Sequence, residues 1–380
     1  MDIIIFLLDN PLFFLLIAFG FTFIVQFFFY TFYYFRILFY KNKPELNKNT
    51  EGVSIIICAK NEQENLEKFL PSILEQDYPN YEVIIVNDCS EDETEFVIQR
   101  LQQKYRHLKS TTIKKDDKFY HSKKLALTVG IKAASNDILL FTDADCKAES
   151  PKWIERMQRH FTNKTDIVLA YGGYFSEKKL INNLIRFDTL FIALQYLTFA
   201  LARKTYMGVG RNMAYRKSLF FKNKGFASHY HIESGDDDLF ISQTANKTNV
   251  SVEISHDSIT RSQAELSFAN WFKQKKRHLS TGKLYKFKTK WRLFCENTSR
   301  IAFYTLFIFS LIFFKEYYIY IISVFAFRTI LQLIVYKVAM KRLNEKHLLL
   351  PSLLYDIFIP FLNLSFLLIN NLSRKKNRWK

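Results

Sequence analysis

Two carboxylates that follow a short apolar run are the residues in this chain best placed to do chemistry. The stretch Ile138–Cys146 begins with four apolar residues and carries Asp143 and Asp145 directly after them. Such a run is typical of a buried strand covered on both faces. Carboxylates at i and i+2 can direct oxygens to one hard cation, Mg²⁺ or Mn²⁺, which readily shares its ligands with a diphosphate. The alternative for an isolated Asp-x-Asp pair is an ordinary Asx turn, and only the neighbouring residues favour the metal site.

A second acidic group stands further along the chain. Asp236, Asp237 and Asp238 are consecutive and follow Gly235. Carboxylates in this position are typical of a helix N-terminus, where they favour the positive end of the helix dipole. One of them can also act as a general base, taking a proton from an attacking hydroxyl group. On the residues alone both interpretations stay open.

Two cationic residues can hold the negative charge of a diphosphate. Lys123 can act as a point charge, and Arg277 can form two parallel hydrogen bonds to phosphate oxygens. Taken alone, Lys123 is better explained as a solvated helix lysine. Arg277 lies in the basic run Lys273–His278, which equally suits a lipid-facing surface, and the two interpretations of Arg277 are compatible.

The elements expected to carry these residues alternate between strands and helices. The predicted strands are residues 53–58, 82–87, 108–114 and the run from 138, and the predicted helices are residues 65–75, 91–105 and 121–134. This alternation predicts a parallel sheet with helices on both faces, in which ligands bind at the carboxyl ends of the strands. Asn61, Glu62 and Asp88 follow two of these strands, so we expect them near the aspartates. Helix capping and turn formation explain the same three residues about equally well.

Both ends of the chain are apolar enough for a bilayer. Residues 1–40 exceed the roughly 20 residues that cross a membrane, which predicts an uncleaved transmembrane helix. The basic residues after it predict an outside N-terminus and a cytosolic domain over residues 51–290. Within that domain, residues 180–206 are expected to lie on the membrane or cover the core rather than to span. Two to three membrane segments are predicted over residues 299–372, before a basic tail at residues 373–380.

The last of these membrane segments has several possible placements. Basic residues on both sides of it favour the cytoplasm, and one crossing cannot satisfy both. Three placements therefore stay open for this segment: broken, re-entrant or interfacial. They are suggested by Pro351, Asp356 and Pro360 within it.

Charge and cysteine content narrow the class of protein. The net charge is +18, which lipid headgroups largely explain in a chain with membrane segments. No zinc-finger spacing or RNP-type signature is present, so nucleic acid is not an expected partner. The four cysteines lie far apart without a CxxC pair, which is typical of reduced thiols in a cytosolic compartment.

At this point the chain resembles a family 2 glycosyltransferase of the GT-A fold, over roughly residues 51–285. The resemblance rests on an ordered set of motifs at residues 53–62, 86–92, 123–130, 141–145, 208–216, 234–239 and 274–278. The chain departs from the usual pattern at Ser122 and Thr128, where Gly and Asn are common, and at His278, where membrane synthases carry Trp.

The resemblance implies an α/β fold with a Rossmann-like, mostly parallel sheet and a role for each matching residue. It implies a metal site at Asp143 and Asp145, a catalytic base at Asp237 with Asp236 beside it, and Asp238 as a weaker candidate. The implied donor-binding residues are Asn61, Glu62, Asp88, Lys123, Asp143, Gln274 and Arg277. The implied acceptor-side residues are Arg211, Asn212 and His278.

The expected protein is therefore a membrane-anchored, inverting glycosyltransferase dependent on Mg²⁺ or Mn²⁺. It would be a multi-pass plasma-membrane protein that moves a sugar from a nucleotide-diphosphate donor to a lipid-linked or polysaccharide acceptor. Two alternatives stay open: a processive polysaccharide synthase, and a non-catalytic membrane subunit that keeps the fold. His278 and the small number of membrane segments speak against a full translocation channel.

Overall fold

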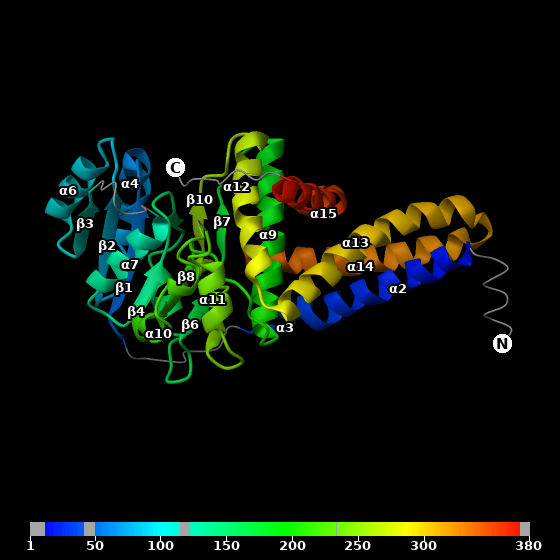
Figure 1. Ribbon diagram of the computed structural model, residues 1–380, viewed down its shortest axis with the longest axis horizontal. Helices are drawn as coiled ribbons and strands as arrows, with labels where there is room; N and C mark the ends of the chain where they lie inside the picture. Colours follow the sequence, from blue (N-terminus) through cyan, green and yellow to red (C-terminus); the bar gives the residue numbers. More distant parts are fainter. Residues whose placement is uncertain (1–11, 42–49, 115–121, 233, 373–380) are drawn as a thin grey trace.

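The computed structural model describes residues 12–41, 50–114, 122–232 and 234–372. A mixed α/β domain forms one end of the molecule, and a bundle of long helices extends from it (Figure 1). Most of residues 1–40 and the helical residues of 299–372 lie within this description, whereas the predicted basic tail at residues 373–380 lies outside it.

The α/β domain is organised on a seven-stranded sheet of order β3-β2-β1-β4-β8-β6-β9. The first four strands are parallel, and β8 runs antiparallel to its neighbours β4 and β6. The sheet is thus mostly parallel, as predicted. The strands are β1 (Val53–Ala59), β2 (Tyr81–Asp88), β3 (Leu108–Ile113), β4 (Ile138–Phe141), β6 (Ile167–Leu169), β8 (Met213–Arg216) and β9 (Val250–Val252).

The apolar runs of the central strands are continuous because both faces of the sheet are covered. In β1, Ile55 and Ile57 belong to one hydrophobic cluster and Ile56 to another, as expected for side chains that alternate between faces. The helices that connect the parallel strands are α4 (Gln63–Phe69), α5 (Pro71–Leu74), α6 (Thr94–Lys104) and α7 (Lys123–Ala133). Ser122 caps α7, since its hydroxyl accepts a hydrogen bond from the Leu125 amide.

A smaller three-stranded sheet lies beside the first. Its order is β5-β10-β7, with bounds Lys147–Ala148, Thr260–Ser262 and Gly172–Tyr174. The remaining helices of the α/β domain are α8 (Trp153–Gln158), α9 (Leu180–Leu201), α10 (Lys217–Lys222), α11 (Asp238–Thr244) and α12 (Phe268–Ser280).

Helix α9 accounts for most of the stretch at residues 180–206. It is long and apolar enough to cross a membrane, but 78% of its most apolar window is buried by the rest of the protein. Its side chains, among them Phe187, Leu190 and Leu194, belong to the main hydrophobic cluster. Of the two placements considered for this stretch, the burial therefore favours covering the core.

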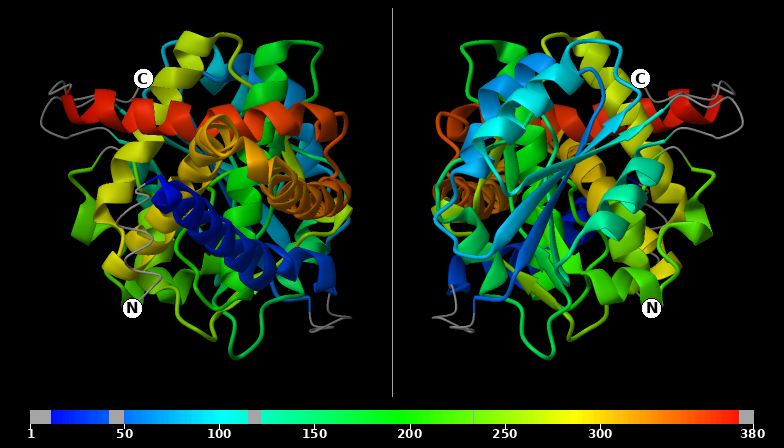
Figure 2. Two further views of the ribbon diagram at one scale, coloured as in Figure 1. Left: turned by 90° about the vertical axis from the view of Figure 1, so that its right-hand side faces the viewer. Right: turned by 90° about the vertical axis from the view of Figure 1, so that its left-hand side faces the viewer.

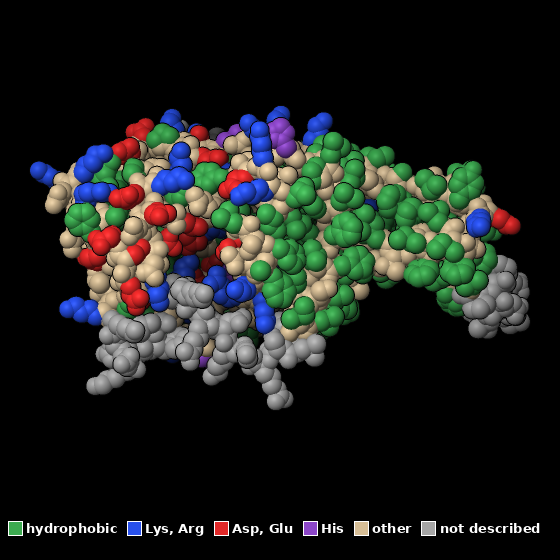
Figure 3. Space-filling model, turned by 90° about the horizontal axis from the view of Figure 1, so that it is seen from above, with side chains coloured by type: hydrophobic (Ala, Val, Ile, Leu, Met, Phe, Trp, Pro, Cys, Tyr) green, Lys and Arg blue, Asp and Glu red, His purple; other side chains and the backbone are tan. Residues whose placement is uncertain are grey.

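The helices outside the α/β domain expose their apolar side chains. They are α2 (Phe13–Phe29), which continues through a π-helical turn (Tyr30–Tyr34) into α3 (Arg36–Phe39), and α13 (Phe287–Phe313), α14 (Tyr318–Arg342) and α15 (Leu349–Leu372). Besides α9, three described segments are long and apolar enough to cross a membrane, at residues 13–39, 315–342 and 351–369, and 22–28% of their apolar windows is buried. Hydrophobic side chains accordingly cover this part of the surface, whereas charged ones gather over the α/β domain (Figure 3).

Helix α15 is continuous through Pro360, which disfavours the broken alternative among the three left open for this segment. It runs across the bundle of α2, α13 and α14 rather than along it (Figures 1 and 2). This orientation agrees with the interfacial alternative for residues 348–372. Its outward side chains are apolar and exposed, including Leu350, Leu354, Phe358 and Leu368.

A buried charged network joins α15 to the bundle. The Asp356 carboxylate accepts hydrogen bonds from the Tyr304 and Tyr336 hydroxyls at 2.6 and 2.5 Å. It also forms ion pairs with Arg300 at 3.1 Å and Arg328 at 2.9 Å. Charges inside an apolar helical bundle are tolerated when they are paired in this way.

Candidate active site

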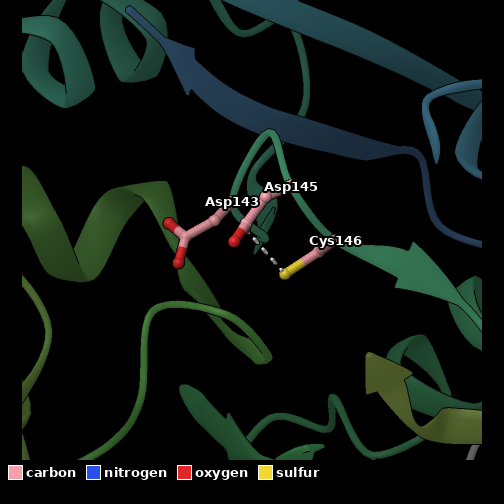
Figure 4. A group of neighbouring side chains, drawn as sticks. All are labelled: Asp143, Asp145 and Cys146. Carbon is pink, nitrogen blue, oxygen red and sulfur yellow. Dashed lines mark hydrogen bonds between the residues drawn. The ribbon is translucent and has the colours of Figure 1, made fainter. Parts of the chain in front are cut away.

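The two aspartates of the predicted metal site lie on a turn at the carboxyl end of β4. The strand ends at Phe141, earlier than the predicted stretch, and the turn is closed by a hydrogen bond of 3.1 Å from the Cys146 amide to the Asp143 carbonyl. Asp143, Asp145 and Cys146 each offer a ligand atom within 4.8 Å of the others (Figure 4). Burial raises the pKa of the Cys146 thiol well above its usual range, so the carboxylates are the ligands suited to a hard cation.

The two carboxylates differ in charge environment. Burial disfavours the charged form of Asp143, but the Lys123 ammonium, 2.7 Å from its Oδ1, outweighs burial and lowers the pKa. Burial and the neighbouring charge of Asp143 raise the pKa of Asp145, whose Oδ2 accepts a hydrogen bond of 2.5 Å from Ser262. Two oxygen ligands that repel each other fit a divalent cation, because its charge would relieve that repulsion.

Lys123 connects this pair to the acidic triplet. Its ammonium lies 3.8 Å from Asp236 Oδ2 as well as beside Asp143. The first turn of α7 therefore brings the two acidic groups, 93 residues apart between Asp143 and Asp236, to one place.

The triplet divides into residues with different surroundings. Gly235 has φ +98°, a left-handed conformation that favours glycine, and the chain then enters α11 with Asp237 as its N-cap. Asp237 Oδ2 accepts a hydrogen bond of 2.8 Å from the Gly210 amide. Burial and then the adjacent carboxylates of Asp236 and Asp238 raise the pKa of Asp237 to about 7. A carboxyl group with a pKa near neutrality is suited to proton transfer.

The Asp238 carboxylate is held by hydrogen bonds that give it a structural role. Its Oδ2 accepts hydrogen bonds from the Thr281 hydroxyl at 2.5 Å and the Tyr285 hydroxyl at 2.7 Å. It therefore ties α11 to the chain that follows α12, and among the three it is the least available to a substrate.

The residues after β1 and β2 lie at the same edge of the sheet. The Asn61 side chain accepts a hydrogen bond of 2.8 Å from the Glu91 amide, which links the two loops. Burial raises the pKa of Glu62, as do the nearby charges of Asp145 and Asp143, and its Oε2 accepts a hydrogen bond of 2.6 Å from Asn65. Asp88 ends β2 and is fully buried.

The segment with Arg211 and Asn212 holds two residues with different surroundings. Asn212 is fully buried, and its amide is committed to Trp153 Nε1 at 3.1 Å and to the carbonyls of Tyr171 and Ser258 at 2.8 and 2.7 Å. Asn212 is thus a buried link between elements, and its acceptor-side role stays a prediction. Arg211 stacks over the Tyr174 ring at 4.2 Å, and its charge acts on both Asp143 and Asp145, so it lies beside the metal pair.

Helix α12 carries the three remaining predicted residues. Gln274 interacts with the Tyr174 hydroxyl, and the charge of Arg277 acts on Asp143. His278 follows on the same helix and is exposed. The helix is held by Lys275, whose ammonium lies 3.0 and 2.7 Å from the two Asp188 oxygens.

Two residues that matter at the site were not predicted. Lys124 is fully buried and donates hydrogen bonds of 2.7, 2.5 and 2.8 Å to the carbonyls of His229, Ile232 and Ser234, just before the acidic triplet. Burial lowers its pKa to about 8. Ser262 orients Asp145 from 117 residues away. For Lys124 the available signal was a second lysine in the first turn of α7, whereas an isolated serine gives none.

The fold and the site together define a glycosyltransferase of the GT-A type, with a mostly parallel sheet and an Asp-x-Asp turn at its carboxyl edge. The family models agree. Glycosyl transferase family 2 matches residues 54–222, and glycosyl transferase family group 2 matches residues 143–367, more than half of the chain. The chain belongs to the family 2 glycosyltransferases.

Individual relatives match over shorter regions. An uncharacterized glycosyltransferase of Haemophilus influenzae is 31% identical over 127 residues, 33% of this chain and 38% of that protein. The poly-beta-1,6-N-acetyl-D-glucosamine synthase of Staphylococcus epidermidis is 34% identical over 115 residues, 29% of this chain and 25% of that protein. The match therefore spans well under half the length of these curated relatives.

One solved structure resembles nearly the whole chain. The mannosyltransferase PcManGT from Pyrobaculum calidifontis, in complex with GDP-Man and Mn²⁺, aligns with a TM-score of 0.60. The alignment covers 95% of this chain and 99% of that one at 15% identity. This likeness supports the fold, including the helices outside the α/β domain.

Proposed function

We propose that this protein moves a sugar from a nucleotide-diphosphate donor to a lipid-linked or polysaccharide acceptor, with inversion at the anomeric carbon. The observation that carries the proposal is Lys123, which lies between Asp143 of the metal pair and Asp236 of the triplet. A donor diphosphate at Asp143 and an acceptor hydroxyl at the triplet would then be neighbours. PcManGT, a structural neighbour, is a complex with a nucleotide sugar and Mn²⁺, which supports this class of donor.

The donor end of the site is suited to a diphosphate leaving group. Mg²⁺ or Mn²⁺ held by Asp143 and Asp145 would neutralise the charge that develops on the diphosphate as the sugar departs. The charges of Lys123, Arg211 and Arg277 all act on Asp143. Lys123 and Arg277 can bind the diphosphate oxygens and orient the donor. Asn61, Glu62, Asp88 and Gln274 complete the proposed donor side.

The acceptor end is suited to proton removal. Asp237 is held by the Gly210 amide, so its carboxylate has a fixed orientation. As the acceptor oxygen attacks the anomeric carbon, its proton passes to Asp237 and the sugar leaves the diphosphate. A single displacement of this kind inverts the anomeric centre. Asp236 and His278 are assigned to the same side of the site.

The long apolar helices outside the α/β domain support a reaction at a membrane. We take the plasma membrane to be crossed by α2, by α14 and by α13, whose residues 301–313 are apolar and uncharged after a charged first half. Residues 51–290 and the start of α15 then share the cytoplasmic side. Helix α15 would then lie in the interface, with its exposed Leu350, Leu354 and Phe358 in the leaflet. This arrangement satisfies the basic residues on both sides of α15, which one crossing could not.

A processive polysaccharide synthase is the second candidate, because a poly-beta-1,6-N-acetyl-D-glucosamine synthase is among the relatives. The decisive experiment incubates the purified full chain with labelled nucleotide sugars and bacterial membranes and identifies products by mass spectrometry. We expect one donor to label a lipid or glycan by a single sugar. Long products would establish the synthase, and the absence of both transfer and donor hydrolysis would leave a non-catalytic subunit.

A further inference from the structure

Strand β10 connects three parts of the molecule through three consecutive side chains. The Thr260 hydroxyl donates to the Arg211 carbonyl at 3.0 Å, and the Ser262 hydroxyl donates to Asp145 at 2.5 Å. Between them, Arg261 extends to the turn that joins α14 to α15. One short strand therefore contacts the segment that carries Arg211, the turn at residues 143–146 and the turn between α14 and α15.

Arg261 is held by that turn through several contacts. Its Nη2 donates to the carbonyls of Leu343 and Asn344 at 3.2 and 2.8 Å, and its Nη1 pairs with the Glu345 carboxylate. The Glu345 side chain is fully buried, with further hydrogen bonds of 2.6 Å from Arg186 and 2.9 Å from Tyr171. A buried carboxylate shared by two arginines fixes the position of both.

The path of Arg261 is built into the neighbouring strand. In the register of β10 and β7, Arg261 stands beside Gly173. A Cβ atom at Gly173 would lie 2.2 Å from Arg261 Nη1. The absence of a side chain there lets the guanidinium pass over β7 to Glu345.

A shift of β10 would reach Asp145 by two routes. One is the Ser262 hydroxyl. The other is β5, which begins directly after Cys146 and pairs with β10, Arg261 opposite Lys147. The chain that follows the turn at residues 143–146 is thus hydrogen-bonded to β10, the strand that Glu345 holds through Arg261.

We infer that Glu345 is a positioning residue for the metal site: through Arg261 and β10, the turn after α14 sets the orientation of Asp145. This inference rests on the proposed function, since it assigns the cation to Asp143 and Asp145. It makes the membrane helices part of the support of the catalytic centre rather than an anchor alone.

The test measures Mn²⁺ affinity by electron paramagnetic resonance on the full chain in detergent, with Mn²⁺ alone and with UDP or GDP. Glu345→Gln, Arg261→Met and Ser262→Ala should each raise the dissociation constant, by about 10- to 100-fold as for other residues that orient a metal ligand. Arg186→Met is the matched control, because Arg186 pairs with the same carboxylate but lies on α9. It should lower thermal stability and leave the Mn²⁺ affinity unchanged, because within the described part of the chain Arg186 makes no hydrogen bond to β10 or to the turn that carries Asp145.

The outcomes separate the inference from the proposed function. If Asp145→Ala binds Mn²⁺ like the wild type, the metal assignment is wrong. If Asp145→Ala loses Mn²⁺ while Glu345→Gln and Arg261→Met retain it, the metal site stands and the inference is overturned. Equal losses for Arg186→Met and Arg261→Met would indicate general loosening and also overturn it. Should Arg261→Met not fold, Arg261→Lys keeps the charge, loses the fork to the carbonyls, and gives the same comparison.

Discussion

The Asp237 carboxylate accepts a hydrogen bond of 2.8 Å from the amide of Gly210. This contact joins the N-terminus of α11 to the segment that carries Arg211, so the proposed base is linked to the segment whose arginine acts on Asp143 and Asp145. The geometry makes the role of each carboxylate in the triplet separately testable.

Asp237→Asn should abolish general-base catalysis while keeping the size of the side chain. We expect kcat to fall by about 10²- to 10⁴-fold, with little change in the affinity for nucleoside diphosphate, because Asp143, Asp145 and Lys123 are unaltered. Asp236→Asn and Asp238→Asn should each cost less in kcat. Steady-state kinetics of the three variants decide the matter: normal turnover by all of them would reduce the triplet to a helix cap.

The pH dependence of kcat/KM should show the ionisation of Asp237. A base must be ionised to accept a proton, and the pKa of Asp237 is raised to about 7. The ionised fraction therefore rises as pH increases through 7, and kcat/KM of the wild type should rise with it, falling about tenfold for each unit below the pKa. A profile without an acid limb near this pH would contradict the assignment.

Lys124→Met should impair the same step indirectly. The methionine fills the volume but leaves three carbonyls before the triplet without the ammonium that holds them. Small displacements of a catalytic group can cost up to about 10²-fold in rate, so we expect a lower kcat and an unchanged KM for the donor. Lys132→Met, an exposed position on the same helix, is the control, and equal behaviour of the two variants would remove the positioning role.

Asp356→Ala should destabilise the helical bundle. It leaves the guanidinium groups of Arg300 and Arg328 buried without their shared carboxylate, and the loss of one partner in a buried pair costs about 3–5 kcal/mol. Thermal denaturation in detergent should show a clear drop. Leu354→Ala, on the exposed face of the same helix, should change little. Equal stability of the two variants would mean that the network does not hold α15.

Labelling of single introduced cysteines in intact cells tests the proposed topology. With three crossing helices, Lys164 and Lys247 face the cytoplasm, and Glu316, in the turn between α13 and α14, faces outside; all three are exposed. In intact cells an impermeant thiol reagent should label Glu316→Cys and spare Lys164→Cys and Lys247→Cys, relative to the wild type. The reverse pattern would place the catalytic domain outside, away from cytosolic nucleotide sugars.

The sequence predicted the central strands and the convergence at their carboxyl ends, because buried parallel strands have continuous apolar runs and leave polar residues at one edge. It did not separate Arg211 from Asn212, since neighbouring residues in a motif can point to opposite sides of the chain. Ser262 and Glu345 could not be found from the sequence, and for Lys124 a second lysine beside Lys123 was the one signal. The partners described above for these three residues lie 84 to 174 residues away, and no local pattern records such contacts.

Metal-dependent release of nucleoside diphosphate tests the central claim most directly. The purified full chain, given its donor sugar and acceptor membranes, should release nucleoside diphosphate with Mn²⁺ or Mg²⁺ and stop when EDTA is added. Asp145→Ala, folded as judged by its thermal transition, should stay inactive at any Mn²⁺ concentration. Undiminished release in EDTA, or a wild-type response from Asp145→Ala, would contradict the assignment of the site.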